Sequence, residues 1–214
     1  MRTARNRNSD AEATVLRKSD ASRSQILQAA ARLFRDQGYA ATTLRQIAEA
    51  ADMQAGSIYY HFASKDDLLH EILDTGLRRI FDAVRTAIAQ MPPGASHRRR
   101  IERAIDAHLV TLLKESEFTS ANIRVYGQLP EEAKCRHRRL RQDYARFWDE
   151  LFSEAQAAGE IRDDLQIRPL RMFVLGALNW TVEWFDNRRH SVRELANRTS
   201  LLIFQGIDKR RPDI

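Results

Sequence analysis

The chain lacks the residue sets on which many enzymes and secreted proteins depend. It contains one cysteine, Cys135, which excludes an internal disulfide and a cysteine-based structural zinc site. It has no glycine-rich phosphate loop, no paired metal-binding histidines and no nucleophile elbow. Cys135 and His137 lie two residues apart, a spacing at which helical side chains do not face one another. The sequence therefore predicts a protein that is not an enzyme and has no cofactor.

Long hydrophobic runs are also absent. The longest uninterrupted apolar stretch, residues 172–178, is far shorter than the ~18 residues that a membrane-spanning helix needs. The polar N-terminus has no apolar segment of the kind found in secretory leaders. We therefore expect a cytoplasmic protein with no membrane partner.

What the chain does have is an excess of positive charge and a helix-forming composition. The 35 Lys and Arg residues exceed the 29 Asp and Glu residues and give a formal net charge of +6. Such a balance favours a polyanionic partner, because basic side chains release counterions from phosphates. The 43% hydrophobic residues, with only 8 Gly and 5 Pro, are typical of an ordered, mainly helical protein.

Apolar residues at helical spacing predict an all-α fold, and no strand pattern competes. The expected helices cover about 22–37, 43–51, 54–62, 64–90, 97–114, 118–128, 131–158, 169–186 and 191–205. The chain then divides into a flexible basic arm (1–20), a small helical unit (21–66), a larger helical unit (67–208) and a tail (209–214). The arm lacks an apolar stripe, and we expect it either to be a solvated tail or to enter a DNA minor groove.

Residues 43–65 carry the most informative pattern, two short helical segments that meet at a tight turn. Thr43 and Gln46 have the spacing of a capping box, which begins the first helix. The second segment has only Ile58 and Phe62 to bury, at four-residue spacing. Its remaining side chains project outward and are rich in hydrogen-bonding groups: Gln54, Ser57, Tyr59, Tyr60 and His61. A helix-turn-helix reads DNA with such a surface.

These motifs resemble the TetR family of transcriptional regulators, over residues 26–34, 38–48 and 56–69. Asp52 stands where many members carry glycine, and aspartate tolerates the left-handed conformation. The resemblance implies an all-helical homodimer that binds a palindromic double-stranded operator. In it, residues 21–66 would be the helix-turn-helix DNA-binding domain, and residues 67–208 would be the effector-binding and dimerisation domain. Such proteins usually repress, and a small-molecule effector in the C-terminal domain releases them.

The resemblance also implies a set of DNA-contacting residues. Gln54 and Ser57 would reach base edges and set specificity, while Gly56 would let the helix backbone approach closely. The other implied contacts, mostly to phosphates, are Thr43, Arg45, Tyr59, Tyr60, His61 and Lys65. For Tyr60 the alternative is packing in the core, and for His61 it is capping of a helix end.

The last two predicted helices are apolar over more than one face, which predicts dimerisation through them, although a single crowded core is the alternative. Residues 176–185, after 162–165, are similar to a TetR branch that responds to acyl-CoA thioesters in fatty-acid, aromatic and steroid-ring catabolism. That similarity points to an acyl-CoA effector, and the alternative is a regulator of efflux or stress genes with a hydrophobic non-CoA ligand. The candidate effector residues are Tyr126, Arg138, Arg141, Trp148, Asn179, Trp180 and Trp184.

Three rival interpretations remain for these features. The basic clusters at 97–103 and 134–141 supply cations for CoA phosphates, or they are solvated helix faces paired with nearby carboxylates. A metal sensor would use Cys135 and His137 with His108 or His97, but the spacing is irregular and we predict no metal site. A DNA-compacting protein without effector control would leave the large C-terminal part unused.

Overall fold

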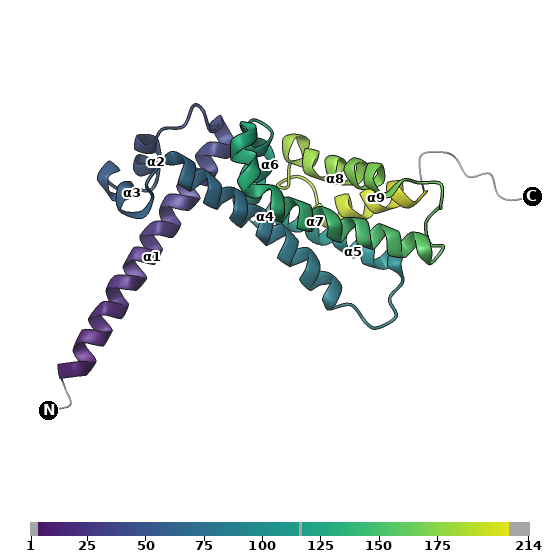
Figure 1. Cartoon of the computed structure of the whole chain (residues 1–214), viewed down its shortest axis with the longest axis horizontal. Helices are drawn as coiled ribbons and strands as arrows, with labels where there is room; N and C mark the ends of the chain where they lie inside the picture. The colour runs from purple at the N-terminus through teal and green to yellow at the C-terminus, as the bar shows by residue number, and fades with distance from the viewer. Residues whose placement is uncertain (1–3, 116, 206–214) are drawn as a thin grey trace, which may run out of the picture. The chain divides into compact units, whose positions relative to one another are not determined.

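The computed structural model describes the backbone of residues 4–115 and 117–205, and the side chains of 19–114 and 117–205. In this part of the chain the regular structure is helical, which confirms the all-α prediction (Figure 1). The helices are α1 (Ala4–Gln37), α2 (Leu44–Ala50), α3 (Ala55–His61), α4 (Lys65–Ala89), α5 (His97–Val110), a π-helical turn η1 (Thr111–Glu115), α6 (Glu117–Tyr126), α7 (Glu131–Ala157), α8 (Ile167–Trp184) and α9 (Val192–Gln205). None of the described helices combines the length and apolar composition needed to cross a membrane.

The first helix is longer than the sequence predicts. We expected it to begin near Ser22, but α1 begins at Ala4, so the prediction of a non-helical arm is wrong for residues 4–20. That segment contains no glycine or proline and is rich in Ala, Arg and other good helix formers. Once the later turns of α1 are fixed by packing, each added residue extends the helix without a new nucleation step. Residues 1–3 of the predicted arm and the tail 209–214 lie outside the described residues.

The chain forms two compact units, residues 1–72 and 73–214, so α4 contributes to both. The sequence placed this boundary between residues 66 and 67, at the start of the same helix. In the first unit, Ile26 and Phe34 of α1, Ile47 of α2 and Ile58 of α3 are fully or almost fully buried together with Leu68 of α4. The C-terminal part of α1, the short helices α2 and α3 and the first turns of α4 thus share one small core.

Two turns position the helices of the first unit. Gly38 follows α1 with φ 85°, in the left-handed region where glycine avoids the Cβ clash. Asp52, between α2 and α3, has φ 55°, the conformation that aspartate tolerates better than most residues. The α2–α3 turn therefore adopts this conformation at an aspartate and not at a glycine.

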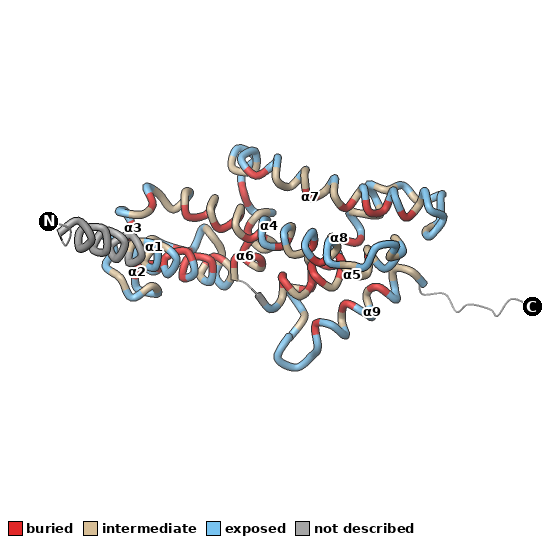
Figure 2. The backbone as a smooth tube through the Cα atoms, turned by 90° about the horizontal axis from the view of Figure 1, so that it is seen from below, coloured by how far each residue is buried: buried red, intermediate tan, exposed pale blue. Residues whose placement is uncertain are grey.

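The second unit is built around α5, whose buried side chains Ile101, Ile105 and Leu109 pack with Trp148 and Phe152 of α7 in one hydrophobic core. Red segments on several helices in Figure 2 mark this buried interior. At Gly76 of α4, a Cβ atom would lie 2.3 Å from the Phe118 carbonyl oxygen of α6. Only glycine permits the two helices to approach so closely here.

Candidate DNA interface and effector pocket

The helix α3 turns almost its whole surface to solvent. Of its residues only Ile58 is buried, and together with the buried C-cap residue Phe62 it holds the helix against the core of the first unit. Tyr59 is 62% exposed and Tyr60 is 80% exposed, so the alternative of core packing for Tyr60 is wrong. The other exposed positions at its N-terminal end are Gln54, Ala55, Gly56 and Ser57. The exposed aromatic and amide side chains of α3 therefore form a surface on which a partner can bind.

The N-terminal end of α3 is open in a way that suits close approach. Gln54 is the N-cap residue, but its side chain makes no capping hydrogen bond, so its amide is free to pair elsewhere. A Cβ atom added at Gly56 would meet no heavy atom of the protein within 4 Å. The packing of the fold therefore does not require glycine at this position.

The preceding helix α2 carries the predicted capping box. The Thr43 hydroxyl accepts a hydrogen bond from the backbone N–H of Gln46 at 3.2 Å. The side-chain Oε1 of Gln46 accepts one from the backbone N–H of Thr43 at 2.8 Å. Arg45 on this helix is strongly exposed and pairs with Glu49 one turn later at 3.0 Å. An exposed pair of this kind contributes little to stability, so Arg45 can exchange Glu49 for another anion at low cost.

Lys65 has a structural task that the sequence did not reveal. Its ammonium donates hydrogen bonds to the carbonyl oxygens of Tyr39 at 2.9 Å and Thr42 at 2.8 Å, and it lies 4.2 Å from the centroid of the Tyr39 ring. Lys65 therefore ties the first turn of α4 to the α1–α2 connection. An ammonium has three donors, which leaves one for the phosphate contact that the sequence predicts.

Tyr39, which accepts one of the Lys65 hydrogen bonds, makes a second polar contact in this region. Its hydroxyl donates a hydrogen bond to Asp66, and burial, helped by the Asp66 carboxylate, raises its pKa. The residues around the helix-turn-helix are thus fixed by polar contacts, while the surface of α3 itself stays exposed.

Of the predicted DNA contacts, His61 is half-buried and its ring packs edge-on against Tyr60 with centroids 5.0 Å apart.

The second unit contains an internal pocket of about 190 Å³, which we call the Arg141 pocket. Its apolar lining comes from α4, α6, α7 and α8: Leu77, Ile80, Ile123, Ala145 and Leu175. Its polar lining comes from α7 and α8: Arg141, Tyr144, Arg171 and Asn179. A small apolar space with a few convergent polar groups is the usual form of a ligand site.

A buried polar network forms one wall of this pocket. His108 Nδ1 lies 2.8 Å from the Tyr144 hydroxyl and its Nε2 lies 3.1 Å from Asn179 Oδ1. A neutral imidazole fits both partners when Nε2 donates to the amide oxygen and Nδ1 accepts from the hydroxyl. Burial lowers the pKa of His108 to about 4, although the hydrogen bond with Asn179 opposes this shift. Burial also raises the pKa of Tyr144. Sequence analysis predicted Asn179 but missed His108 and Tyr144 as members of this site.

His108 is expected to make the stability of the protein depend on pH. The unfolded chain binds a proton at His108 below pH ~6.5, whereas the folded chain does so only near pH 4. The free energy of unfolding should therefore fall as the pH is lowered from 6.5 to 4, with a His108 contribution of about 3 kcal/mol. Urea unfolding of wild type and His108→Gln across this range should show a smaller loss in the variant, and equal slopes would contradict this assignment.

The other predicted effector residues fall into three environments. Tyr126 lies beside the pocket with its ring against Arg141. Trp148 is fully buried in the core of the second unit and does not line the pocket, because its large ring fills the space between α5 and α7. Trp180 and Trp184 are 66% and 57% exposed on α8. Arg138 is also exposed, with a hydrogen bond to Cys135.

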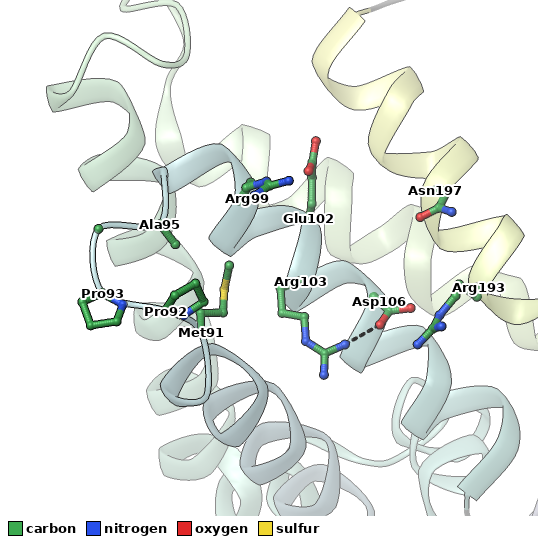
Figure 3. A pocket seen from close by; sticks show the side chains of 11 residues that line it. Met91, Pro92, Pro93, Ala95, Arg99, Glu102, Arg103, Asp106, Arg193 and Asn197 are labelled. Atoms are coloured by element: carbon green, nitrogen blue, oxygen red, sulfur yellow. Dashed lines mark hydrogen bonds and ion pairs between the residues drawn. The ribbon is translucent and has the colours of Figure 1, made fainter.

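The basic cluster at residues 97–103 is largely paired with carboxylates. Arg98 pairs with Glu102 at 2.9 Å, and Arg100 and Arg103 pair with Glu154 and Asp106. Arg103 and Arg99 also line a second pocket of about 480 Å³, with Arg193 of α9 and the connection between α4 and α5 (Figure 3). Two carboxylates, Glu102 and Asp106, share this open pocket, so most of the cluster is a solvated, paired helix surface.

The residues considered for a metal sensor are separated by their contacts. His137 is buried and lies 2.7 Å from Asp74, His108 belongs to the network described above, and Cys135 is exposed. Within the described part of the chain, no three His, Cys, Asp or Glu residues are grouped so that they could hold a metal ion.

The geometry of α2, the turn at Asp52 and the exposed α3 defines a helix-turn-helix DNA-binding protein. Comparison with known families supports this class. Residues 26–72 match the family of bacterial regulatory proteins of the tetR type, and residues 94–207 match the C-terminal domain described as tetracyclin repressor-like. The chain belongs to the TetR family and is a DNA-binding transcriptional regulator.

Individual relatives extend over nearly the whole chain. The transcriptional repressor KstR2 of Mycolicibacterium smegmatis is 27% identical, over 89% of this chain and 93% of that protein. The crystal structure of AibR with isovaleryl coenzyme A and operator DNA has a TM-score of 0.77 at 24% identity and covers 86% of this chain and 98% of that one. FadR from Bacillus subtilis with stearoyl-CoA has a TM-score of 0.71 at 22% identity, over 86% and 98% of the two chains. Both structures share the fold of this protein.

Proposed function

We propose that this protein is a homodimeric, cytoplasmic repressor that binds a palindromic operator and is released by an acyl-CoA thioester. The observation that carries the proposal is the exposure of α3, which is held by Ile58 and the C-cap residue Phe62 and presents Gln54, Ser57 and two tyrosines to solvent. Side chains at the N-terminal end of such a helix reach base edges in the major groove. Gln54 and Ser57 therefore read sequence, while Tyr59, Tyr60 and Lys65 contact phosphates.

The dimer is proposed to form through α8 and α9. Both helices carry large apolar side chains that are more than half exposed: Met172, Phe173, Trp180, Trp184, Leu201 and Leu202. Large apolar side chains exposed together on neighbouring elements often mark an interface. Two copies related by a two-fold axis would present two α3 helices to the two halves of a palindrome.

Support for a thioester effector comes from the relatives and from the pocket. AibR and FadR have been solved with isovaleryl coenzyme A and stearoyl-CoA, and the Arg141 pocket offers an apolar space for an acyl group. For release, the effector must bind the form of the protein that does not fit the operator more tightly than the form that does. Because α4 contributes residues to both units, a shift of its C-terminal part is transmitted along one continuous helix.

The proposal is tested by selecting bound duplexes from a random DNA pool with the purified protein. We expect a palindromic site with two half-sites about 10 base pairs, or a multiple, apart. Fluorescence anisotropy on that site, with a panel of CoA thioesters and the matching free acids, then measures release. Absence of any preferred duplex would refute the operator function, and release by free acids as effective as release by thioesters would refute the role of the CoA part.

A further inference from the structure

The Arg141 pocket contains a guanidinium group that has no carboxylate partner. Arg141 Nη2 donates to Asn122 Oδ1 at 2.7 Å, and its Cζ atom lies 3.3 Å from the centroid of the Tyr126 ring. Its Nε atom is buried and makes no hydrogen bond. Among the described residues, no carboxylate lies within ion-pair distance of Arg141.

The second arginine of the pocket, in contrast, has a carboxylate partner. Arg171 Nε lies 2.7 Å from Asp149 Oδ1, so its charge is neutralised within the protein. Asp74 acts on Arg141 only at longer range, and its carboxylate already pairs with His137 at 2.7 Å. Among the charged residues that line the pocket, Arg141 is therefore the one whose charge no carboxylate within ion-pair distance compensates.

This uncompensated charge is unfavourable in the absence of a ligand. A partly buried cation loses hydration, and only a nearby anion or a full set of acceptors restores the loss. Burial lowers the pKa of Arg141 to about 10, although Tyr126 and Asp74 oppose the shift, and the group remains charged near neutral pH. An arginine that is kept charged and lines an empty space is suited to bind a carboxylate through its guanidinium group.

The remainder of the pocket limits what can accompany that carboxylate. Leu77, Ile80 and Leu175 provide an apolar wall, and the volume is about 190 Å³. A cavity of about 150 Å³ accommodates benzene, so the pocket suits a chain of about five carbons or one six-membered ring. It is too small for a long fatty acyl chain.

We propose that the Arg141 pocket binds a short apolar chain that ends in a carboxylate, with Arg141 as the residue that selects the negative charge. Joined to the proposed function on which it rests, this inference identifies the effector as the CoA thioester of a small dicarboxylic acid. The thioester carbonyl and CoA would lie toward the pocket mouth, and the free carboxylate would face Arg141.

Two thioesters of equal chain length test the inference directly. Glutaryl-CoA and pentanoyl-CoA both carry five-carbon acyl groups, but only the first ends in a carboxylate. Isothermal titration of the full-length protein should show glutaryl-CoA binding at least about tenfold more tightly, as expected for a charge-assisted pair. Pentanoyl-CoA binding as tightly as glutaryl-CoA would overturn the inference.

Variants at two arginines of α7 provide the matched comparison. Arg141→Met keeps an unbranched apolar side chain and removes the charge, so it should abolish the preference for glutaryl-CoA and leave pentanoyl-CoA binding unchanged or stronger. Arg146→Met makes the same change at an exposed position of α7 outside the pocket and should retain the wild-type preference. Thermal unfolding and operator binding verify that both variants fold, and retention of the preference in folded Arg141→Met would count against Arg141. If this variant does not fold, the wild-type ligand pair still decides.

Free pentanoate and pentan-1-ol separate this inference from the thioester proposal. If neither thioester binds but pentanoate binds and pentan-1-ol does not, the carboxylate pocket stands and the acyl-CoA effector is refuted. If none of the four compounds binds at millimolar concentration, the inference about the Arg141 pocket is refuted, while operator recognition is unaffected.

Discussion

Replacing Phe173 and Trp180 together by glutamate is expected to convert the protein to monomers and to lower operator affinity by about 100-fold or more. Both side chains lie on α8 seven residues apart and are 76% and 66% exposed, so they share one face and contribute little to the fold of a single subunit. Burying a large apolar side chain at an interface contributes about 1.5–3 kcal/mol. Losing one subunit also loses the avidity of binding two half-sites.

Sedimentation velocity at micromolar concentration and anisotropy on the selected operator measure the two effects. Ala157→Glu places the same charge at an exposed apolar position at the end of α7 and should leave both unchanged. Unfolding experiments should show that a monomer of the double variant is folded. A dimer that persists in the double variant would place the interface elsewhere.

Gly56→Ala is expected to weaken operator binding at least about tenfold without lowering stability. The added methyl group meets nothing within 4 Å in the free protein, and alanine in a helix is more stable than glycine by about 0.5–1 kcal/mol. In the complex, the same methyl group would occupy space that we assign to the DNA at the N-terminal end of α3. Loss of binding with preserved stability identifies a contact surface and excludes a folding defect.

Gly127→Ala is the matched control, because it adds the same methyl group at an exposed glycine whose Cβ position is also open. This variant should bind the operator like wild type. Thermal unfolding and anisotropy on all three proteins complete the comparison. Wild-type affinity in Gly56→Ala would mean that the helix backbone does not approach DNA closely at this point.

The helix-turn-helix was predictable because its signals are local. The capping box depends on Thr43 and Gln46, which are three residues apart. The buried face of the second helix depends on Ile58 and Phe62, which are about one helical turn apart. The role of Lys65 was not predictable in the same way. Its two carbonyl partners, on Tyr39 and Thr42, lie 26 and 23 residues earlier in the chain, and a lysine near a DNA-binding helix gives no sequence signal for such a contact.

The start of α1 could not be predicted from the sequence for a different reason. A search for apolar stripes finds only helices that bury a face, so it missed residues 4–20, which continue α1 through their intrinsic propensity. The positions of the candidate effector residues could be predicted only in part. Arg141 and Asn179 line the Arg141 pocket, whereas Trp148 lies in the core, because spacing along a helix does not tell which neighbour a buried face meets. The role of these residues in effector binding stays a prediction.

The sequence by itself determined the all-helical fold, the DNA-reading segment and the membership in a regulator family, since these depend on periodicity, caps and short motifs within one turn or two of helix. The tertiary structure decided which charges are paired. Arg171 has Asp149 and Lys65 has two carbonyl oxygens, whereas Arg141 faces a small apolar space without a counter-ion. Pairing depends on distances between helices that are far apart in the chain, and those distances are set only when the whole core packs.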